Sequence, residues 1–113
     1  MARTVLVVDD DPSVLEVIAG MLEDLSYDVL TADSGRDALG QLSRNQRIAI
    51  LITDINMPGM DGHELAERAS KISPELQVIQ LSGRERRRGG FPMIRKPFSA
   101  EDLANIMQRM RDL

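Results

Sequence analysis

The stretch TVLVVDDDPSVL, residues 4–15, passes from an apolar run through three aspartates to a proline. Its first five residues, Thr4–Val8, are apolar or β-branched and predict a buried strand. Three aspartates, residues 9–11, follow at once, and Asp11-Pro12 predicts a helix start, because aspartate caps helices and proline suits the first turn. Neighbouring carboxylates repel one another, and burying even one without a partner is costly. Three acids at the end of a core strand therefore require a source of positive charge.

Short apolar runs alternate with helical patterns along the rest of the chain. Further strands are expected at residues 28–32, 48–53, 76–81 and 92–95. Ser34, Asp61 and Ser99 are the expected caps of three more helices. Five strands that alternate with helices predict an α/β fold, in which helices cover both faces of a parallel sheet. The length of 113 residues suits one domain, and we expect a single domain over residues 1–113.

The composition excludes several classes of protein. The chain has no cysteine, which excludes disulfides, thiolate catalysis and cysteine metal sites and fits a cytoplasmic location. No apolar run reaches the length of a membrane span, and the N-terminus lacks the apolar core of a signal peptide. The net charge of -4 does not suit a molecule that binds a polyanion over its whole surface. We therefore expect a cytoplasmic protein that binds neither membrane nor nucleic acid.

Polar residues follow the expected strands at their carboxyl ends, where α/β sheets gather their functional groups. Asp9 and Asp10 follow the first strand, Asp54 the third, Ser82 the fourth and Lys96 the fifth. Clustered carboxylates without histidine or cysteine favour a hard cation such as Mg²⁺. A lysine and a hydroxyl add donors for a phosphoryl group. Because no histidine is placed to act as a base, an aspartate can itself be the nucleophile that forms an acyl phosphate.

Four motifs carry a resemblance to a known family. They are VLVVDDDP, ITDINMPGMDGHEL, QLSG and IRKPFS, in this order along the chain. Together they closely resemble the receiver domain of two-component response regulators. The resemblance implies a flavodoxin-like (CheY-like) doubly wound sheet with strand order 2-1-3-4-5. It also implies a phosphoacceptor in a phosphorelay, which takes a phosphoryl group from the phosphohistidine of a histidine kinase or histidine phosphotransfer protein.

The resemblance further implies a Mg²⁺-dependent reaction and assigns residues to it. Asp54 is implied to be the phosphoacceptor. Asp9, Asp10, Asp54 and the backbone carbonyl of Asn56 are implied to hold Mg²⁺. Lys96 is implied to pair with Asp54 and then with its phosphate. The domain phosphorylates itself and then changes its affinity for partners, so it is not expected to be an enzyme with a separate substrate.

The switch of the family is only partly present. Ser82 resembles the hydroxyl that moves to the phosphoryl oxygen. Met93 stands three residues before the lysine, where the family usually has tyrosine or phenylalanine. Phe91 lies two residues away, on the same face of the expected strand. The bond between Lys96 and Pro97 is implied to be cis, as proline permits.

The region of the fourth helix is shortened. Only residues 83–95 separate Ser82 from Lys96, so the helix between the last two strands is expected to be reduced or missing. Shortened versions resemble receivers of hybrid histidine kinases and some stand-alone ones. Four arginines lie in this stretch: Arg84, Arg86, Arg87 and Arg88. Two interpretations stay open, a solvent-exposed loop and a docking patch for an acidic downstream protein.

His63 is the only histidine of the chain. It follows Asp61 and Gly62 at a helix start, and we expect an exposed helix residue. An Asp-x-His pattern also occurs in cobalamin-binding domains of similar layout. There it follows the first strand, however, and this chain lacks the later glycine-rich segments.

Two other functions stay open. One is a Mg²⁺-dependent phosphatase that forms an aspartyl phosphate. Asp9 and Asp11 formally match the Asp-x-Asp motif of that class, but the short chain and Asp54 count against it. The other is a pseudo-receiver, an interaction module that keeps the fold without phosphorylation. Met93 and the shortened fourth region favour that interpretation.

Overall fold

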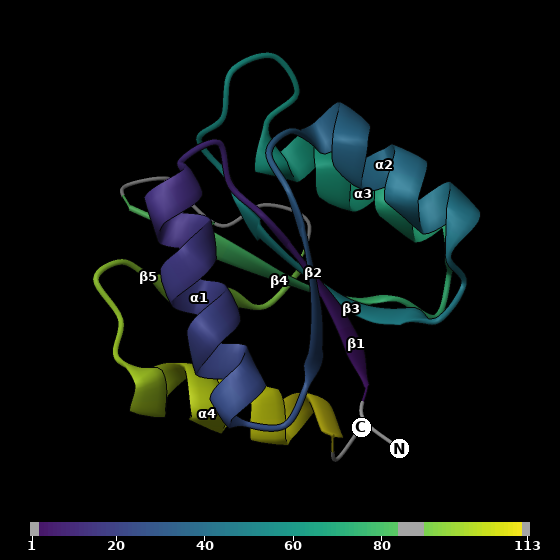
Figure 1. Ribbon diagram of the computed structural model, residues 1–113. Coiled ribbons are helices and arrows are strands. Elements are labelled where there is room, and N and C mark those ends of the chain that lie inside the picture. The colour runs from purple at the N-terminus through teal and green to yellow at the C-terminus, as the bar shows by residue number, and fades with distance from the viewer. Residues whose placement is uncertain (1–2, 84–89, 112–113) are drawn as a thin grey trace.

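The computed structural model describes residues 3–83 and 90–111. Strands and helices follow one another as β1 (Thr4–Val8), α1 (Pro12–Asp24), β2 (Asp28–Ala32), α2 (Gly35–Arg44), β3 (Ile48–Asp54), α3 (Gly62–Ile72), β4 (Gln77–Ser82), β5 (Met93–Arg95) and α4 (Ala100–Arg111). The strands form one parallel sheet of order β2-β1-β3-β4-β5 (Figure 1). The predicted α/β fold and its strand order are confirmed.

Two strands reach further than the sequence pattern indicated. β3 extends to Asp54, which pairs with Leu81 of β4, and β4 extends to Ser82, which pairs with Arg95 of β5. Two of the predicted site residues therefore belong to the sheet itself. Their backbones are held by the strand ladder, so their side chains are presented from a rigid platform.

The helices begin where the sequence predicted. Side-chain oxygens of Asp11, Ser34 and Asp61 accept hydrogen bonds from backbone N–H groups in the first turns of α1, α2 and α3. Ser99 and Asp102 cap α4 reciprocally, each accepting from the other's backbone N–H at 3.0 Å. Such contacts satisfy N–H groups that a helix start leaves unpaired. Within the described part of the chain, no helix is long and apolar enough to cross a membrane.

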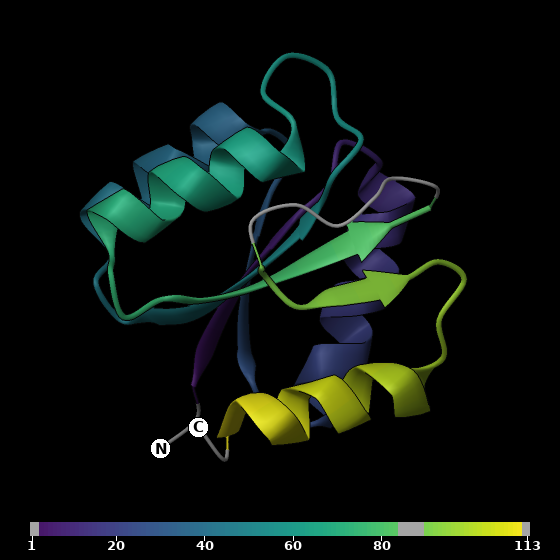
Figure 2. The ribbon, with the colours of Figure 1, turned by 180° about the vertical axis from the view of Figure 1, so that it is seen from behind.

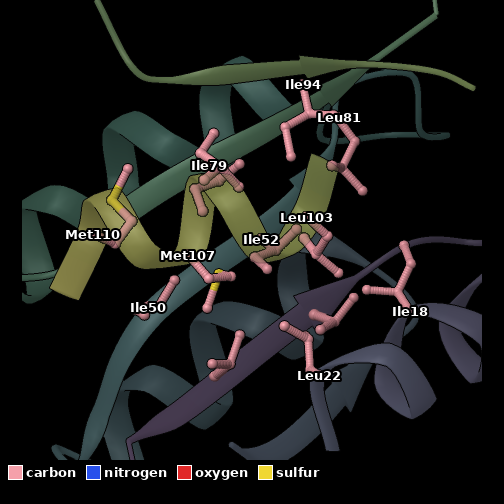
Figure 3. Packing of buried hydrophobic residues seen from close by; sticks show 13 residues of the cluster. Ile18, Leu22, Ile50, Ile52, Ile79, Leu81, Ile94, Leu103, Met107 and Met110 are labelled. Atoms are coloured by element: carbon pink, nitrogen blue, oxygen red, sulfur yellow. The ribbon is translucent and has the colours of Figure 1, made fainter. Parts of the chain in front are cut away.

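The sheet is covered on both faces, with α1 and α4 on one side and α2 and α3 on the other (Figures 1 and 2). On the first face, α1 and α4 pack against the central strands (Figure 3). The hydrophobic cluster between them includes Ile18 and Leu22 of α1, Ile50 and Ile52 of β3, and Leu103 and Met107 of α4. On the other face, α2 and α3 bury alanines and leucines against β1 and β3. Burial on both faces explains why these strands are apolar without alternation.

The connection between β4 and β5 is short. Its described residues, 83 and 90–92, contain no helix. Residues 84–89 lie outside the described residues, and the four arginines of the predicted docking patch fall within them. The predictions for that segment therefore stay predictions.

Both ends of the described chain lie at the edge of the sheet where the strands begin (Figure 1). Arg3 donates a hydrogen bond from Nη2 to Oε1 of Gln77 at 2.9 Å. Gln77 in turn donates from Nε2 to the carbonyl of Met110 at 3.1 Å. The start of β1, the start of β4 and the end of α4 are thus joined by one side chain.

Candidate functional site

Three acids meet at the edge of the sheet where the strands end. Asp9 directly follows β1, Asp10 comes next, and Asp54 is the last residue of β3. Each offers a carboxylate oxygen that lies within 4.8 Å of the other two. Asp9 is 2% exposed and Asp54 6%, whereas Asp10 is exposed. The predicted acidic cluster is therefore formed, with two of its carboxylates withdrawn from water.

Lys96, which follows β5, supplies positive charge to this cluster. Its Nζ lies 3.1 Å from Oδ1 of Asp54 and 3.6 Å from Oδ2 of Asp9. Burial opposes the ammonium charge, but the hydrogen bond to Asp54 and the attraction of both carboxylates outweigh it, so the pKa of Lys96 is raised. The lysine is held in place by its backbone N–H, which donates to the carbonyl of Ser82 at 2.7 Å. The bond between Lys96 and Pro97 is cis, as expected.

Among the described residues, one lysine does not balance three carboxylates. Burial raises the pKa of Asp9, and the nearby charges of Asp54 and Asp10 raise it further, against the opposing effects of the Asp11 N–H and Lys96. Oδ1 of Asp9 accepts from the backbone N–H of Asp11 at 3.0 Å. Its other oxygen, Oδ2, is buried and has no hydrogen-bond partner among the described residues. A buried carboxylate oxygen without a hydrogen bond, beside two further acids, belongs to a donor set able to hold a hard cation.

Asp11 is separate from this cluster. Its side chain is exposed and caps α1, accepting from the N–H of Ser13 at 2.9 Å. The Asp-x-Asp pair that a phosphatase would need is therefore divided, since only Asp9 belongs to the acidic group. This geometry counts against the phosphatase alternative.

The backbone behind Asp54 is tightly packed. The hydroxyl of Thr53 donates to the Asp54 carbonyl at 2.8 Å. Gly62, the first residue of α3, donates its N–H to the carbonyl of Ile55 at 2.8 Å. A Cβ on Gly62 would overlap the Asp54 carbonyl oxygen and lie 2.6 Å from the Cα of Ile55. Only glycine lets α3 begin this close to Asp54.

The loop between β3 and α3 carries Asn56. Its side chain is exposed, while the next residue, Met57, is buried in the core beneath α2 and α3. The loop is thus anchored by Met57 at one side of Asn56 and by Asp54 at the other. The role of the Asn56 carbonyl as a metal ligand stays a prediction.

The predicted switch residues lie on β4 and β5. Ser82 is completely buried at the end of β4. Met93 is half-buried at the start of β5 and pairs with Gln80 of β4. Phe91 is half-buried and packs against the core beneath α2 and α3. Ser82 and Met93 therefore occupy neighbouring strands, Ser82 at the end of β4 and Met93 at the start of β5, and their part in switching stays a prediction.

The prediction that His63 is exposed is wrong. The side chain is 8% exposed, and its Nδ1 lies 3.4 Å from Nε2 of Gln80. Exposure of a residue in the first turn of a helix depends on what that turn faces, and here it faces β4. Gln80 itself was missed, although a glutamine inside the apolar run VIQLS is a visible signal.

Comparison with known proteins decides the family. The sequence model of the response regulator receiver domain matches residues 5–108. The chain belongs to the response regulator receiver domain family. This receiver domain is a phosphoacceptor domain of two-component signalling, without a separate substrate.

The receiver domain is similar to proteins of several kinds. The nitrogen assimilation regulatory protein NtrX of Azorhizobium caulinodans is 34% identical over 96% of this chain, which spans 26% of that protein. The crystal structure of a receiver domain protein from Clostridium thermocellum has a TM-score of 0.86 and 32% identity, covering 98% of both chains. The receiver domain of the hybrid histidine kinase CckA has a TM-score of 0.85 and 33% identity, covering 94% of this chain and 96% of that one.

Proposed function

We propose that this receiver domain accepts a phosphoryl group on Asp54 from a phosphohistidine, in a Mg²⁺-dependent reaction. One observation carries the proposal: Nζ of Lys96 lies 3.1 Å from Oδ1 of Asp54, within a cluster that also contains Asp9 and Asp10. The side chain of Asp54 is 9% exposed and lies beside the partly exposed Lys96 and the exposed Asp10, so it suits a nucleophile that a phosphodonor must reach.

The reaction forms one bond and breaks another. A carboxylate oxygen of Asp54 attacks the phosphorus, the P–N bond of the phosphohistidine breaks, and its electron pair stays on the imidazole, which then takes a proton from water. Lys96, which already donates a hydrogen bond to Oδ1 of Asp54, is close enough to neutralise charge on the phosphoryl oxygens. Its charge is retained at neutral pH, because its pKa is raised. Lys96 therefore needs no proton transfer to do this.

The proposed metal ligands are Asp9, Asp10, Asp54 and the backbone carbonyl of Asn56. Mg²⁺ bound there would neutralise negative charge on the carboxylates and on the incoming phosphoryl group. Support comes from Oδ2 of Asp9, which lacks a hydrogen bond, and from the excess of carboxylates over cations among the described residues at this edge. The oxygen-only donor set is of the kind that Mg²⁺ prefers.

The proposed response involves Ser82 and Met93. Ser82 is buried two strands away from Asp9 and one from Asp54, so its hydroxyl is placed to follow a new phosphoryl oxygen by a small movement. On β5, Arg95 pairs with Ser82, and Met93 lies two residues earlier, opposite Gln80, so we propose that Met93 responds to a movement of the β4 end through the β4–β5 pairing. The methionine replaces the aromatic residue of the usual switch with a flexible side chain.

The proposed phosphodonor is a histidine kinase or a histidine phosphotransfer protein. Similarity to the receiver domain of the hybrid histidine kinase CckA supports this class of donor. We further propose that residues 1–113 form one receiver domain that acts in the cytoplasm, which the absence of cysteine supports. A downstream protein partner is proposed at the arginines of residues 84–88, which lie outside the described residues. Neither a nucleic acid nor a membrane belongs to the proposed function.

The experiment is intact-mass spectrometry after incubation with acetyl phosphate, with and without Mg²⁺. We expect one phosphoryl adduct on the wild type in Mg²⁺ and none on Asp54→Asn. Asp33→Asn is the matched control, because Asp33 is an exposed aspartate that follows β2 at the same edge. It should be modified like the wild type. An unmodified wild type, under conditions that modify another receiver, would reject the proposal and favour a pseudo-receiver.

A further inference from the structure

A buried amide near the site has no part in the chemistry proposed above. Gln80 lies inside β4 and is completely buried. Its Nε2 lies 3.3 Å from the carbonyl oxygen of Gly62 and 3.4 Å from Nδ1 of His63. Its Oε1 has no hydrogen-bond partner within residues 3–83 and 90–111. A fully buried amide with an unpartnered oxygen lowers stability relative to an apolar side chain of similar size, so its presence needs another reason.

The contacts fix the orientation of this amide. The carbonyl of Gly62 can only accept, so Gln80 must present its nitrogen to that oxygen. The second N–H of the same nitrogen then faces His63, whose Nδ1 acts as acceptor while the ring carries its proton on Nε2. Gln80 therefore ties two successive residues of the first turn of α3 to β4.

This turn is the one that packs behind Asp54. Gly62 lies against the Asp54 carbonyl oxygen so closely that a Cβ would not fit. Gln80 also precedes Ser82 by two residues, so both side chains point to the same face of β4, and it pairs with Met93 across the sheet. One side chain thus connects the strand of the proposed switch with the backbone of the proposed phosphoacceptor.

We propose that Gln80 is a positioning residue of the phosphorylation site. Its amide holds the first turn of α3 against the backbone of Asp54 and thereby fixes the loop that carries Asn56. The loop is anchored at one end by β3 and at the other by Gly62, so loss of the contact between Gln80 and Gly62 weakens the second anchor, which keeps its hydrogen bond to Ile55. The assignment rests on the proposed function, since it concerns the site where the phosphoryl group is accepted.

The test replaces Gln80 with methionine, which has a similar length and volume but no hydrogen-bonding amide. Hydrogen exchange of the Gly62 amide, measured by NMR on the metal-free domain, reports how firmly the turn is held, because this N–H bonds to Ile55. We expect the Gly62 amide to exchange about threefold to tenfold faster in Gln80→Met than in the wild type. This factor corresponds to the net contribution of one hydrogen bond. The maximal rate of phosphorylation by acetyl phosphate should fall by a similar factor. The thermal midpoint should change little, because the loss of the contacts to Gly62 and His63 and the removal of the unpartnered oxygen act in opposite directions.

Gln77→Met is the matched control on the same strand. Gln77 also uses its amide, but it binds Arg3 and Met110 at the opposite end of β4. Its replacement should leave both the exchange of Gly62 and the phosphorylation rate at wild-type values. His63→Leu removes one of the two contacts of Gln80 and should accelerate exchange by a smaller factor. If Gln80→Met does not fold, the same measurements on His63→Leu test the proposal.

Two results would overturn the assignment. One is unchanged Gly62 exchange and an unchanged phosphorylation rate in Gln80→Met. The other is faster exchange over the whole sheet with a lower thermal midpoint, because that pattern means general packing. A wild type that takes no phosphoryl group would instead reject the proposed function, and Gly62 exchange would still decide whether Gln80 holds the turn.

Discussion

Nζ of Lys96 lies 3.1 Å from Oδ1 of Asp54, although the two residues are 42 positions apart in the chain. The contact joins the end of β3 to the residue that follows β5, across the intervening end of β4. Asp9 shares the same ammonium at 3.6 Å, so one cation faces two buried carboxylates and a third, exposed one nearby. Carboxylates outnumber cations among the described residues here, so substitution of the lysine and substitution of the acids should change stability in opposite directions.

Removal of the lysine should destabilise the domain. Lys96→Met leaves Asp9 and Asp54 without their cation, and we expect the free energy of unfolding at pH 7 to fall by about 2 kcal/mol. The pKa of Lys96 is raised above its usual 10.5, so this stabilisation is fully present below pH 10.5 and is lost as pH rises through the raised pKa. Urea denaturation of both proteins at pH 7 and above pH 10.5 measures the difference. Equal stability of Lys96→Met and the wild type at pH 7 would contradict the prediction.

Neutralising Asp9 should stabilise the metal-free domain. Asparagine keeps an oxygen that can accept from the Asp11 N–H, and it removes a buried negative charge. We expect Asp9→Asn to raise the free energy of unfolding at pH 7 by about 1 kcal/mol, a common size for a point substitution.

The gain from Asp9→Asn should depend on pH. Because the pKa of Asp9 is raised above 3.8, the folded wild type binds a proton more readily than the unfolded chain, and its stability falls as pH rises through that range. The advantage of the variant should therefore shrink as pH is lowered through the raised pKa toward 3.8. A urea series over pH in the presence of a chelator measures it. If the variant were less stable than the wild type at pH 7, burial and repulsion would not destabilise the ionised carboxylate of Asp9 as we predict.

Magnesium should stabilise the wild type by an amount that depends on the ratio of the Mg²⁺ concentration to its Kd. At ten times its Kd, a ligand that binds only the folded state adds about 1.4 kcal/mol. We expect the thermal midpoint to rise with MgCl₂, to return on addition of a chelator, and to respond far less in Asp10→Asn. NaCl at equal ionic strength controls for screening of the carboxylates. A rise of the same size with NaCl would show that no specific site is filled.

A methyl group at Gly62 should disturb both stability and the site. The new Cβ of Gly62→Ala would meet backbone atoms of Asp54 and Ile55, which cannot move aside as a side chain can. We expect a loss of about 2 kcal/mol in the free energy of unfolding and slower phosphorylation of Asp54.

Gly20→Ala is the control for Gly62→Ala. Gly20 lies inside α1, and a Cβ at this position would have nothing within 4 Å. The variant should therefore gain about 0.5 kcal/mol from the higher helix propensity of alanine. Comparison by urea denaturation separates a steric effect from the general consequence of replacing glycine. Equal stabilities for Gly62→Ala and the wild type would mean that α3 can shift away from Asp54 at little cost.

Much of the fold and the acidic cluster followed from sequence patterns, because those patterns are local. Asp11-Pro12 marks the start of α1 by capping chemistry, and apolar runs mark strands that are buried on both faces. Parallel strands bring their carboxyl ends to one edge. Placing Asp9, Asp54 and Lys96 at strand ends was therefore enough to bring them together.

The contact between His63 and Gln80 could not be predicted in the same way. Residues at the start of a helix are commonly exposed, and burial of His63 depends on how closely α3 approaches β4. That distance is set by Gly62 against Asp54, a packing relationship that periodicity does not encode. The observed ends of β3 and β4 differ from the predicted ends for a related reason, because they depend on pairing with the neighbouring strands.

The bridge from Arg3 through Gln77 to the carbonyl of Met110 links the first and last parts of the described chain, at the edge of the sheet remote from the carboxylates. A short glycine-rich link between them would close the backbone without crossing the acidic edge. New ends could then be opened in the turn between α2 and β3, for example between the exposed residues Gln46 and Arg47. Such a circularly permuted domain should keep the arrangement of Asp9, Asp54 and Lys96, because these residues depend on the parallel sheet and not on the order in which its strands are connected.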